Sequence, residues 1–309
     1  INEKEIKFKQ IKNKINEYLN ERQFKKGGWF TIKDLFINKN KIYLSYTREL
    51  KENCWNTSLL SSDLDLNKLE FKILYSPKKC IKSLPNKEGE FNAHQSGGRI
   101  ISTDESNLIF SIGDYRQRYL PQDNENDFGK ILNLNINTGN SKILSLGHRN
   151  PQGLYFDSKE NFILETEHGP EGGDEINIII PNKNPIPNFG WPIASYGEHY
   201  GGKNEKNLNL YKKYPLLKSH KDNGFIEPIK YFTPSIGISQ ITKIEKMNEY
   251  LLTSLIAESL YFFELDSKEL IINDLTKIFL GERIRDIIYT DNMAILFLEN
   301  TGSIGIIKF

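Results

Sequence analysis

Short runs of hydrophobic residues, bounded by Asn, Asp, Gly or Lys, recur along the chain and predict β-strands. Alternating or continuous apolar runs between turn-forming residues are typical of strands. Ten strands are predicted, at residues 42–47, 71–75, 108–112, 130–136, 161–166, 176–180, 250–255, 260–265, 294–298 and 304–309. The segment 11–19 differs, because Ile11, Ile15 and Leu19 recur at helical spacing and predict a helix. As a whole, the pattern predicts an all-β protein.

Similar strand sequences recur along the chain and indicate a repeated unit. The five strands are IYLSYT, LIFSIG, FILETE, YLLTSL and AILFLE, which begin at residues 42, 108, 162, 250 and 294. A loose period of this kind is typical of a β-propeller, in which each blade is one four-stranded antiparallel sheet. If one unit near 190–235 is counted as a blade without this strand, the spacing predicts six blades, the first of them short. A β-sandwich or barrel also spaces its strands regularly and is the alternative.

The long segment 181–230 is rich in Pro, Gly, Asn and Lys and has little regular patterning. Loops of this length inside a compact domain are usually functional or disordered. No Gly/Ser-rich linker divides the chain, so residues 1–309 are expected to form a single domain.

The charge and cysteine content limit the possible partners and compartments. The 41 Lys+Arg and 40 Asp+Glu residues leave a formal net charge of +1, which argues against a nucleic-acid partner. No apolar run reaches the ~18 residues of a membrane span. Cys54 and Cys80 would form one bridge in an exported protein, or would be two buried thiols. Because the chain begins with Ile1, either a leader has been removed or the sequence is a fragment.

Four of the five histidines lie between residues 94 and 202, but their spacing excludes a zinc signature, since HExxH and CxxC are absent from the sequence. His94 precedes a Gly-Gly turn in HQSGGRI, and Asp114 ends the next predicted strand in SIGD. A histidine beside a carboxylate can act as a general base near neutral pH. The alternative is that His94 caps a turn and Asp114 merely begins a loop.

Two further motifs point to anion and metal binding. GHRNPQGL (147–154) places Arg149 and Asn150 at a strand end, where an arginine can bind an anion bidentately, although surface arginines at turns are common. EHGPEGGDEIN (167–177) combines three glycines with four carboxylates. Carboxylate and carbonyl oxygens on such a turn are the ligands that calcium prefers, and a solvated acidic turn is the alternative.

Taken in order, seven motifs resemble the glucose/sorbosone dehydrogenase family, and most closely its aldose sugar dehydrogenase branch. They are HQSGGRI, SIGD, GHRNPQGL, EHGPEGGDEIN, NFGWP (188–192), SYGEHYGG (195–202) and GERIRDI (281–287), and the likeness runs from about Gly27 to the C-terminus. The resemblance implies a six-bladed propeller that binds pyrroloquinoline quinone (PQQ) and Ca²⁺ and oxidises the C1 hydroxyl of aldose sugars to lactones. It also implies an external electron acceptor and a periplasmic or secreted location.

The resemblance further implies roles for individual residues. His94 would take the proton of the sugar hydroxyl, supported by Asp114, and Arg149 would stabilise charge on the cofactor. The residues implied in cofactor binding are His94, Arg149, Asn150, His168, Gly169, Pro170, Arg283 and Arg285. The carbonyls of Gly169 and Pro170 would hold one calcium, and Glu175 with the backbone of Phe189 would hold a second.

Three positions depart from the family pattern. Lys26 stands where the family usually has a cofactor-binding Gln, Phe232 where a Trp often lines the cofactor, and Ile256 where one branch has a Lys. These changes favour an alternative, in which a catalytically impaired propeller of the same family serves as a binding module. A calcium-dependent lactonase on a propeller is a third possibility, but no set of side-chain ligands for it is visible. Only about 26 residues precede Gly27, so the first blade is expected to be truncated or incomplete.

Overall fold

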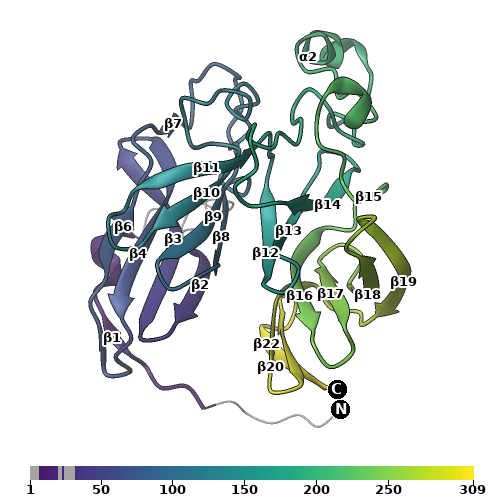
Figure 1. The fold of residues 1–309 in the computed structure, drawn as a ribbon. Coiled ribbons are helices and arrows are strands. Elements are labelled where there is room, and N and C mark those ends of the chain that lie inside the picture. The colour runs from purple at the N-terminus through teal and green to yellow at the C-terminus, as the bar shows by residue number, and fades with distance from the viewer. Residues whose placement is uncertain (1–6, 20–22, 24–31) are drawn as a thin grey trace.

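Antiparallel sheets make up most of the computed structural model, which describes residues 7–19, 23 and 32–309 (Figure 1). The first sheet contains β2 (Ile32–Asn38), β3 (Lys41–Lys51), β4 (Cys54–Asp63) and β6 (Lys72–Tyr75), with β7 (Ile81–Lys82) also paired to β4. The second contains β8 (Gly97–Ser102), β9 (Asn107–Ile112), β10 (Lys130–Asn135) and β11 (Ser141–Leu146). The third contains β12 (Pro151–Asp157), β13 (Phe162–Glu167), β14 (Asp174–Ile179) and β15 (Lys230–Phe232).

Two more sheets and a few short elements complete the described chain. The fourth sheet contains β16 (Ile238–Ile244), β17 (Glu249–Ser254), β18 (Ser259–Asp266) and β19 (Ile271–Phe279). The fifth contains β20 (Ile284–Thr290), β21 (Met293–Leu298) and β22 (Ser303–Lys308). The short elements are the parallel pair β1 (Lys12–Asn13) and β5 (Lys68–Leu69), the helix α2 (Leu208–Lys213), and 3₁₀ turns at Ile15–Glu17, Glu205–Asn207 and Lys221–Asn223. No helix in the described ranges is long and apolar enough to cross a membrane.

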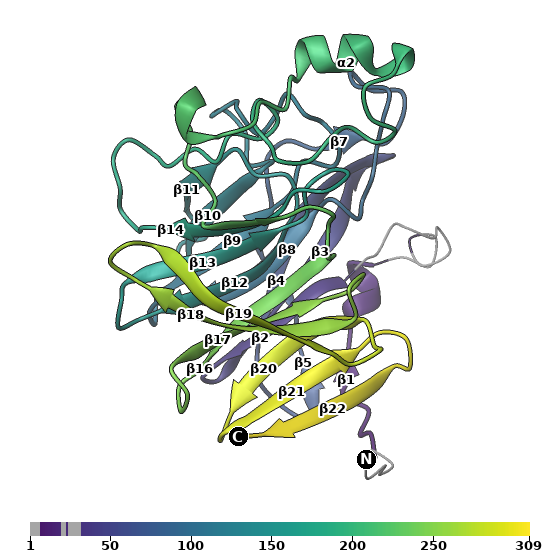
Figure 2. The ribbon, with the colours of Figure 1, turned by 90° about the vertical axis from the view of Figure 1, so that its right-hand side faces the viewer.

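The five sheets follow one another around a common centre, as the blades of a propeller do (Figure 2). Their first strands pack side by side in the order β2, β8, β12, β16 and β20. Buried apolar residues fill the spaces between neighbouring sheets, for example Tyr43 and Leu59 against Phe110, and Leu164 against Ile241. The all-β propeller class and all ten predicted strands are confirmed.

The number of blades predicted from the sequence differs from the sheets observed. The described residues form five ring sheets, whereas the spacing predicted six with an incomplete first blade. Segment 190–235, which the spacing assigned to a blade of its own, is not a separate sheet: most of it is the long connection between β14 and β15, which carries α2 (Figure 1). The turn at Gly27, on which the first blade was placed, lies outside the described residues.

The prediction of a helix at 11–19 is wrong, although the apolar residues of this segment do face the core. Lys12 and Asn13 pair with β5 in an extended conformation, and only a single 3₁₀ turn at Ile15–Glu17 follows them. Ile15 and Leu19 pack on the outer core of the first sheet. The periodicity therefore reports one-sided burial of an irregular segment.

Each first strand carries a β-bulge at its beginning. Register shifts occur at the starts of β2, β8, β12, β16 and β20. Bulges re-aim side chains and are frequent beside functional sites. Because these strands start at the same end of the ring, the residues just before β8, β12, β16 and β20 are brought together there.

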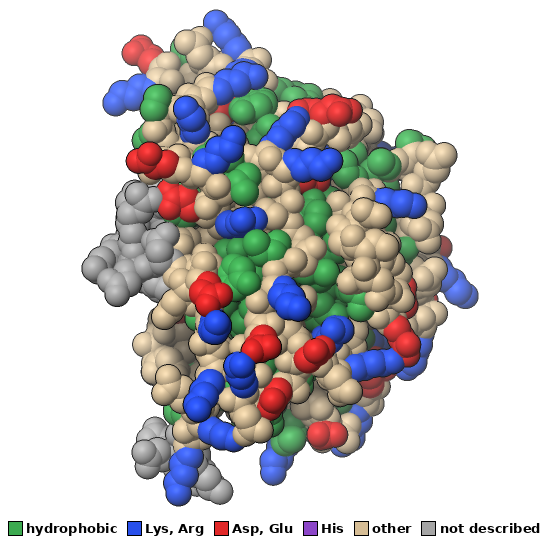
Figure 3. All heavy atoms as spheres, turned by 90° about the vertical axis from the view of Figure 1, so that its left-hand side faces the viewer, with side chains coloured by type: hydrophobic (Ala, Val, Ile, Leu, Met, Phe, Trp, Pro, Cys, Tyr) green, Lys and Arg blue, Asp and Glu red, His purple; other side chains and the backbone are tan. Residues whose placement is uncertain are grey.

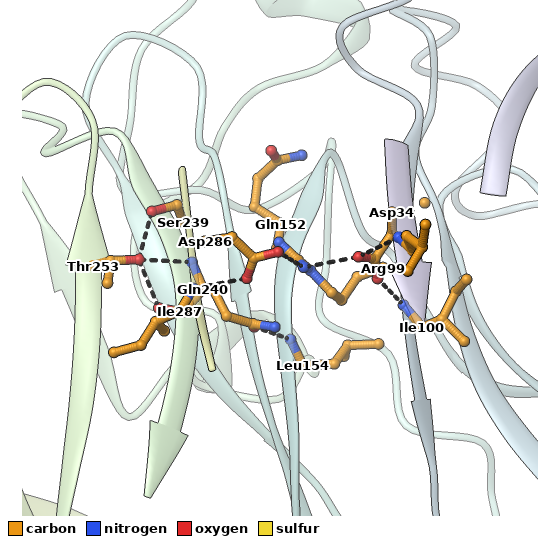
Figure 4. A network of polar contacts seen from close by, with 12 residues as sticks. Asp34, Arg99, Ile100, Gln152, Leu154, Ser239, Gln240, Thr253, Asp286 and Ile287 are labelled. Atoms are coloured by element: carbon orange, nitrogen blue, oxygen red, sulfur yellow. Dashed lines mark hydrogen bonds and ion pairs between the residues drawn. The ribbon is translucent and has the colours of Figure 1, made fainter. Parts of the chain in front are cut away.

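A buried polar network ties the first strands together near the ring centre (Figure 4). The Arg99 guanidinium of β8 donates to Asp34 of β2 (3.1 Å) and to Asp286 of β20 (2.7 Å), and its Nε donates to the carbonyl of Gln152 in β12 (2.9 Å). Burial raises the pKa of Asp34 to about 6, against the opposing effect of Arg99. One side chain thus joins four of the five sheets.

The two cysteines are bridged, and the charged side chains are mixed over the surface. Cys54 and Cys80 form a disulfide, which connects β4 with the segment before β7. On the face shown in Figure 3, basic and acidic side chains are intermixed. That distribution agrees with the near-zero net charge.

Candidate active site

A cavity of about 510 Å³ lies at the bulged end of the ring. It is lined by residues from the segments before β8, β12, β16 and β20 and by the turn between β13 and β14. All eight residues predicted to bind the cofactor line it, namely His94, Arg149, Asn150, His168, Gly169, Pro170, Arg283 and Arg285. The structure thus brings together residues that are up to 191 positions apart in the sequence.

His94 is exposed to the cavity on the turn before β8. Its backbone N–H donates to the Asn92 side chain (2.8 Å), which fixes the turn. Desolvation by the surrounding atoms lowers the pKa of His94 below its ordinary 6.5, and the positive charges of Lys33 and Arg285 lower it further. The imidazole is therefore mostly neutral at pH 7, as a group that accepts a proton must be.

Asp114 is fully buried behind this turn. Its carboxylate accepts hydrogen bonds from the Gln95 amide (3.1 Å) and from the Trp191 indole (2.8 Å). Burial raises the pKa of Asp114, whereas the charge of Arg149 opposes that rise. Since Gln95 directly follows His94, these bonds hold the turn that presents the imidazole; the predicted support of His94 by Asp114 stays a prediction.

Arg149 is a buried side chain whose guanidinium is held from several sides. It donates to the carbonyl of His168 (2.9 Å) and to the hydroxyl of Tyr200 (3.2 Å), and it lies over the Trp191 ring at 5.5 Å. The neighbouring Asn150 carbonyl accepts the N–H of His168 (3.2 Å). A fixed guanidinium at the wall of a cavity is suited to an anionic or developing negative charge.

The turn between β13 and β14 is tightly packed. The N–H of Gly169 donates to the Asp174 carboxylate (3.1 Å), which also accepts the N–H of Ile238 (3.0 Å). A Cβ on Gly169 would lie 2.1 Å from the carbonyl oxygen of Gly173, so a larger residue cannot enter without moving backbone. Backbone carbonyls beside Gly169 and Pro170 at the cavity wall are donors of the kind that suit calcium.

The two arginines near the C-terminal end share one carboxylate. Arg285 donates to Glu299 (2.8 Å), and an Arg283 guanidinium nitrogen lies 3.6 Å from the same oxygen. Arg283 also reaches the carbonyl of Leu255 (3.5 Å). With Arg149, they give the cavity three guanidinium groups, a donor set that fits a small polyanion such as PQQ.

The second predicted calcium set, Glu175 and Phe189, lies in a small separate cavity. Burial and the charge of Glu167 raise the pKa of Glu175 well above its ordinary value. The groups around the pair include imidazoles: His220 Nε2 lies 3.5 Å from a Glu175 oxygen, and the ring of His148 packs on Phe189 at 4.9 Å. One imidazole, that of His220, thus lies beside Glu175, and the predicted second calcium set stays a prediction.

The departures from the family pattern have different structural settings. Phe232 is buried in the core against Tyr261 and does not line the cavity, whereas Pro234 does. Ile256 is 66% exposed at the cavity wall. Lys26 lies outside the described residues.

Sequence reasoning missed three groups that organise the cavity: Tyr200, Trp191 and Glu299. Tyr200 and Trp191 belong to the motifs SYGEHYGG and NFGWP, which marked their segments but gave the two side chains no role. Glu299 follows β21 in an ordinary polar turn, and nothing in its local sequence distinguishes it.

The family model described as Glucose / Sorbosone dehydrogenase matches residues 9–308. The chain belongs to the glucose/sorbosone dehydrogenase family. It is 28% identical over 220 residues to the aldose sugar dehydrogenase YliI of Escherichia coli K12, a match that covers 66% of this chain and 53% of the relative. It is 32% identical over 159 residues to quinoprotein glucose dehydrogenase B of Acinetobacter calcoaceticus, which covers 41% and 31% of the two chains. The chain thus spans about half the length of the E. coli relative.

A solved relative supports the assignment of the fold. The PQQ-bound aldose sugar dehydrogenase of Streptomyces coelicolor superposes with a TM-score of 0.63 at 22% identity, covering 87% of this chain and 75% of that one. At this identity the likeness establishes the propeller fold alone. The residue roles within this member of the glucose/sorbosone dehydrogenase family therefore depend on its own geometry.

Proposed function

We propose that this member of the family is a PQQ- and Ca²⁺-dependent sugar dehydrogenase that oxidises the C1 hydroxyl of aldoses. The observation that carries the proposal is the convergence of His94 and three arginines on one cavity beside a glycine-rich turn. Bound PQQ would supply the hydride acceptor that the protein itself lacks. The family membership and the PQQ-bound relative support the cofactor assignment.

The chain's own residues divide the remaining work. Arg283 and Arg285 would bind the carboxylates of the cofactor, and Arg149 would stabilise negative charge near its reactive end. The neutral imidazole of His94 would accept the proton of the sugar hydroxyl. The carbonyls of Gly169 and Pro170 would hold a calcium ion against the cofactor.

We also propose that the protein is exported and that a sixth sheet completes the ring. The Cys54–Cys80 disulfide supports export to an oxidising compartment. Leu35 on β2 and Ile288 on β20 are 52% and 50% exposed, and a further sheet between these two strands would bury apolar surface of this kind.

The test is a titration of the metal-loaded protein with PQQ, followed by dye-linked oxidation of a panel of aldoses. We expect saturable binding and aldose oxidation, with His94→Ala losing activity while still binding PQQ and keeping its circular dichroism spectrum. Binding without turnover would instead indicate the non-catalytic binding module, an alternative favoured by the apolar Ile256 at the cavity wall. No binding at micromolar PQQ would refute both.

A further inference from the structure

Three glutamates and two histidines are buried together behind the candidate active site. Glu165 and Glu167 lie on the same face of β13, because residues two apart in a strand point the same way. On β14, Asn177 is directly opposite Glu165, and Glu175 is opposite Glu167. His148, from the turn after β11, and His220, beside Glu175, complete this group, which we call the buried chamber. The exposure of His148, Glu165 and Asn177 is 0%.

The charges in the buried chamber are not balanced by fixed cations. Among the described residues, the only basic side chains within 4 Å of Glu165, Glu167 and Glu175 are the imidazoles of His148 and His220, and no lysine or arginine lies that close. Unpaired buried carboxylates are strongly unfavourable. A protonated carboxyl needs an acceptor for its hydroxyl, but Glu165 Oε1 has no hydrogen-bond partner. A bound cation would satisfy these groups together.

Three ligand atoms already converge within the chamber. His148 Nδ1 lies 3.2 Å from Glu167 Oε1 and 3.9 Å from Glu165 Oε2, and one ligand atom from each residue falls within 4.8 Å of the others. Both ring nitrogens of the buried His220 also lack hydrogen bonds, and this side chain borders the small cavity that Glu167 and Glu175 line. These unpaired nitrogens of His220 are a second observation, independent of the three converging atoms, that buried polar groups in the chamber lack hydrogen-bond partners.

Each converging residue is oriented by a second contact, as metal ligands usually are. His148 Nε2 is 2.8 Å from Ser145 Oγ; donation to that oxygen leaves the Nδ1 lone pair facing the carboxylates. Glu167 Oε2 accepts the backbone N–H of Arg149 (2.6 Å), which leaves Oε1 for a cation. The Asn177 amide lies 3.0 Å from Glu165 Oε2, and rotating it by 180° would present its unpaired oxygen as a fourth donor.

We propose that His148, Glu165 and Glu167 bind one divalent transition-metal ion of the zinc or manganese class, and not calcium. An imidazole with carboxylates is a donor set of such ions, whereas calcium takes oxygen ligands. The proposed ion is separate from the calcium at Gly169 and Pro170 and does not depend on PQQ. It is also separate from the predicted second calcium set of Glu175 and Phe189, because its three ligands are different residues.

Metal binding to the PQQ-free full chain tests this proposal, so that failure of the proposed function does not affect the outcome. Chelator-treated protein is titrated with Zn²⁺ in the presence of about a hundredfold excess of Ca²⁺. We expect one tightly bound Zn²⁺ per chain and a raised midpoint of thermal unfolding. Glu165→Gln should weaken Zn²⁺ binding by at least about 10-fold, whereas the matched surface variant Glu160→Gln should not.

Displacement of Zn²⁺ by the calcium excess would overturn the proposal, and so would Glu165→Gln protein that binds Zn²⁺ like the wild type. If Glu165→Gln does not fold, anomalous scattering from zinc-soaked wild-type crystals decides. A peak at roughly 2.0–2.2 Å from His148 Nδ1 supports the site, and its absence refutes it.

Discussion

Replacing Arg99 with methionine should destabilise the protein strongly, because this side chain pairs with two carboxylates from other sheets. Arg99 is 9% exposed and Asp34 is 8% exposed, so both charges are largely removed from water. Removing one partner of a buried ion pair typically costs about 3–5 kcal/mol, since the remaining charge stays buried. Methionine preserves much of the apolar stem of the arginine side chain, so the decrease in stability is due mainly to the loss of the guanidinium group.

The destabilisation should increase with pH. The folded-state pKa of Asp34 is about 6, above its ordinary 3.8, so folding takes up a proton between these values and stability falls as the pH rises through them. This difference corresponds to about 3 kcal/mol at neutral pH. Without Arg99 the pKa of Asp34 in the folded protein rises further, so the free energy of unfolding of the variant continues to fall above pH 6. Arg99→Met should therefore be closer to wild type at pH 5 than at pH 8.

Urea denaturation at pH 5 and pH 8, followed by tryptophan fluorescence, measures the effect. We expect the midpoint to fall by about 1 M or more at pH 8. Arg116→Met is a matched control, because Arg116 pairs with the half-exposed Glu90 and should change stability by less than about 1 kcal/mol. Equal midpoints for Arg99→Met and wild type, or a larger loss at pH 5, would refute the reasoning.

Three other predictions concern the disulfide, the glycine turn and the base. Cys54→Ser/Cys80→Ser, which opens a link across 26 positions, should lower the free energy of unfolding by about 3 kcal/mol, measured by denaturation with and without reductant; reductant should not affect the variant. Gly169→Ala should weaken calcium-dependent PQQ binding by about 10-fold or more in fluorescence titrations, because its Cβ would meet the Gly173 carbonyl, whereas Gly305→Ala, where a Cβ has room, should not. The acidic limb of kcat/KM should have an apparent pKa below 6.5, because His94 protonates with a lowered pKa; a limb above 7 would argue against His94 as the base.

The sequence was most informative where strands are apolar and least where buried faces are polar. Strands such as β9 and β17 were predicted from their hydrophobic residues alone. By contrast, β4 was missed because it buries polar residues that are satisfied by side-chain hydrogen bonds, for example Thr57 to the carbonyl of Ser96 (2.8 Å). Likewise β8 begins with two glycines at positive φ, which local patterning does not associate with a strand.

The cavity residues were predicted from motifs, whereas their supporting partners were not. His94, Arg149 and Arg283 each precede the first strand of a sheet, and Gly169 follows β13, so the propeller topology brings these motifs to one end of the ring. Glu299 and Arg99 act across sheets, and no local pattern encodes such a contact. Glu165 was similarly hidden within the predicted strand 161–166, where a buried charge is evident only after the register with Asn177 is known.

The placement of charge also explains how a chain with a net charge of +1 can offer three arginines to an anion. The guanidinium groups face the cavity, while three glutamates are buried directly behind it. Glu167 connects the two layers, because its carboxylate accepts the backbone N–H groups of Arg149 (2.6 Å) and Asn150 (3.3 Å). A cation held between Glu165 and Glu167 would fix this carboxylate in place, and through its hydrogen bonds it would also fix the backbone of the two anion-binding residues.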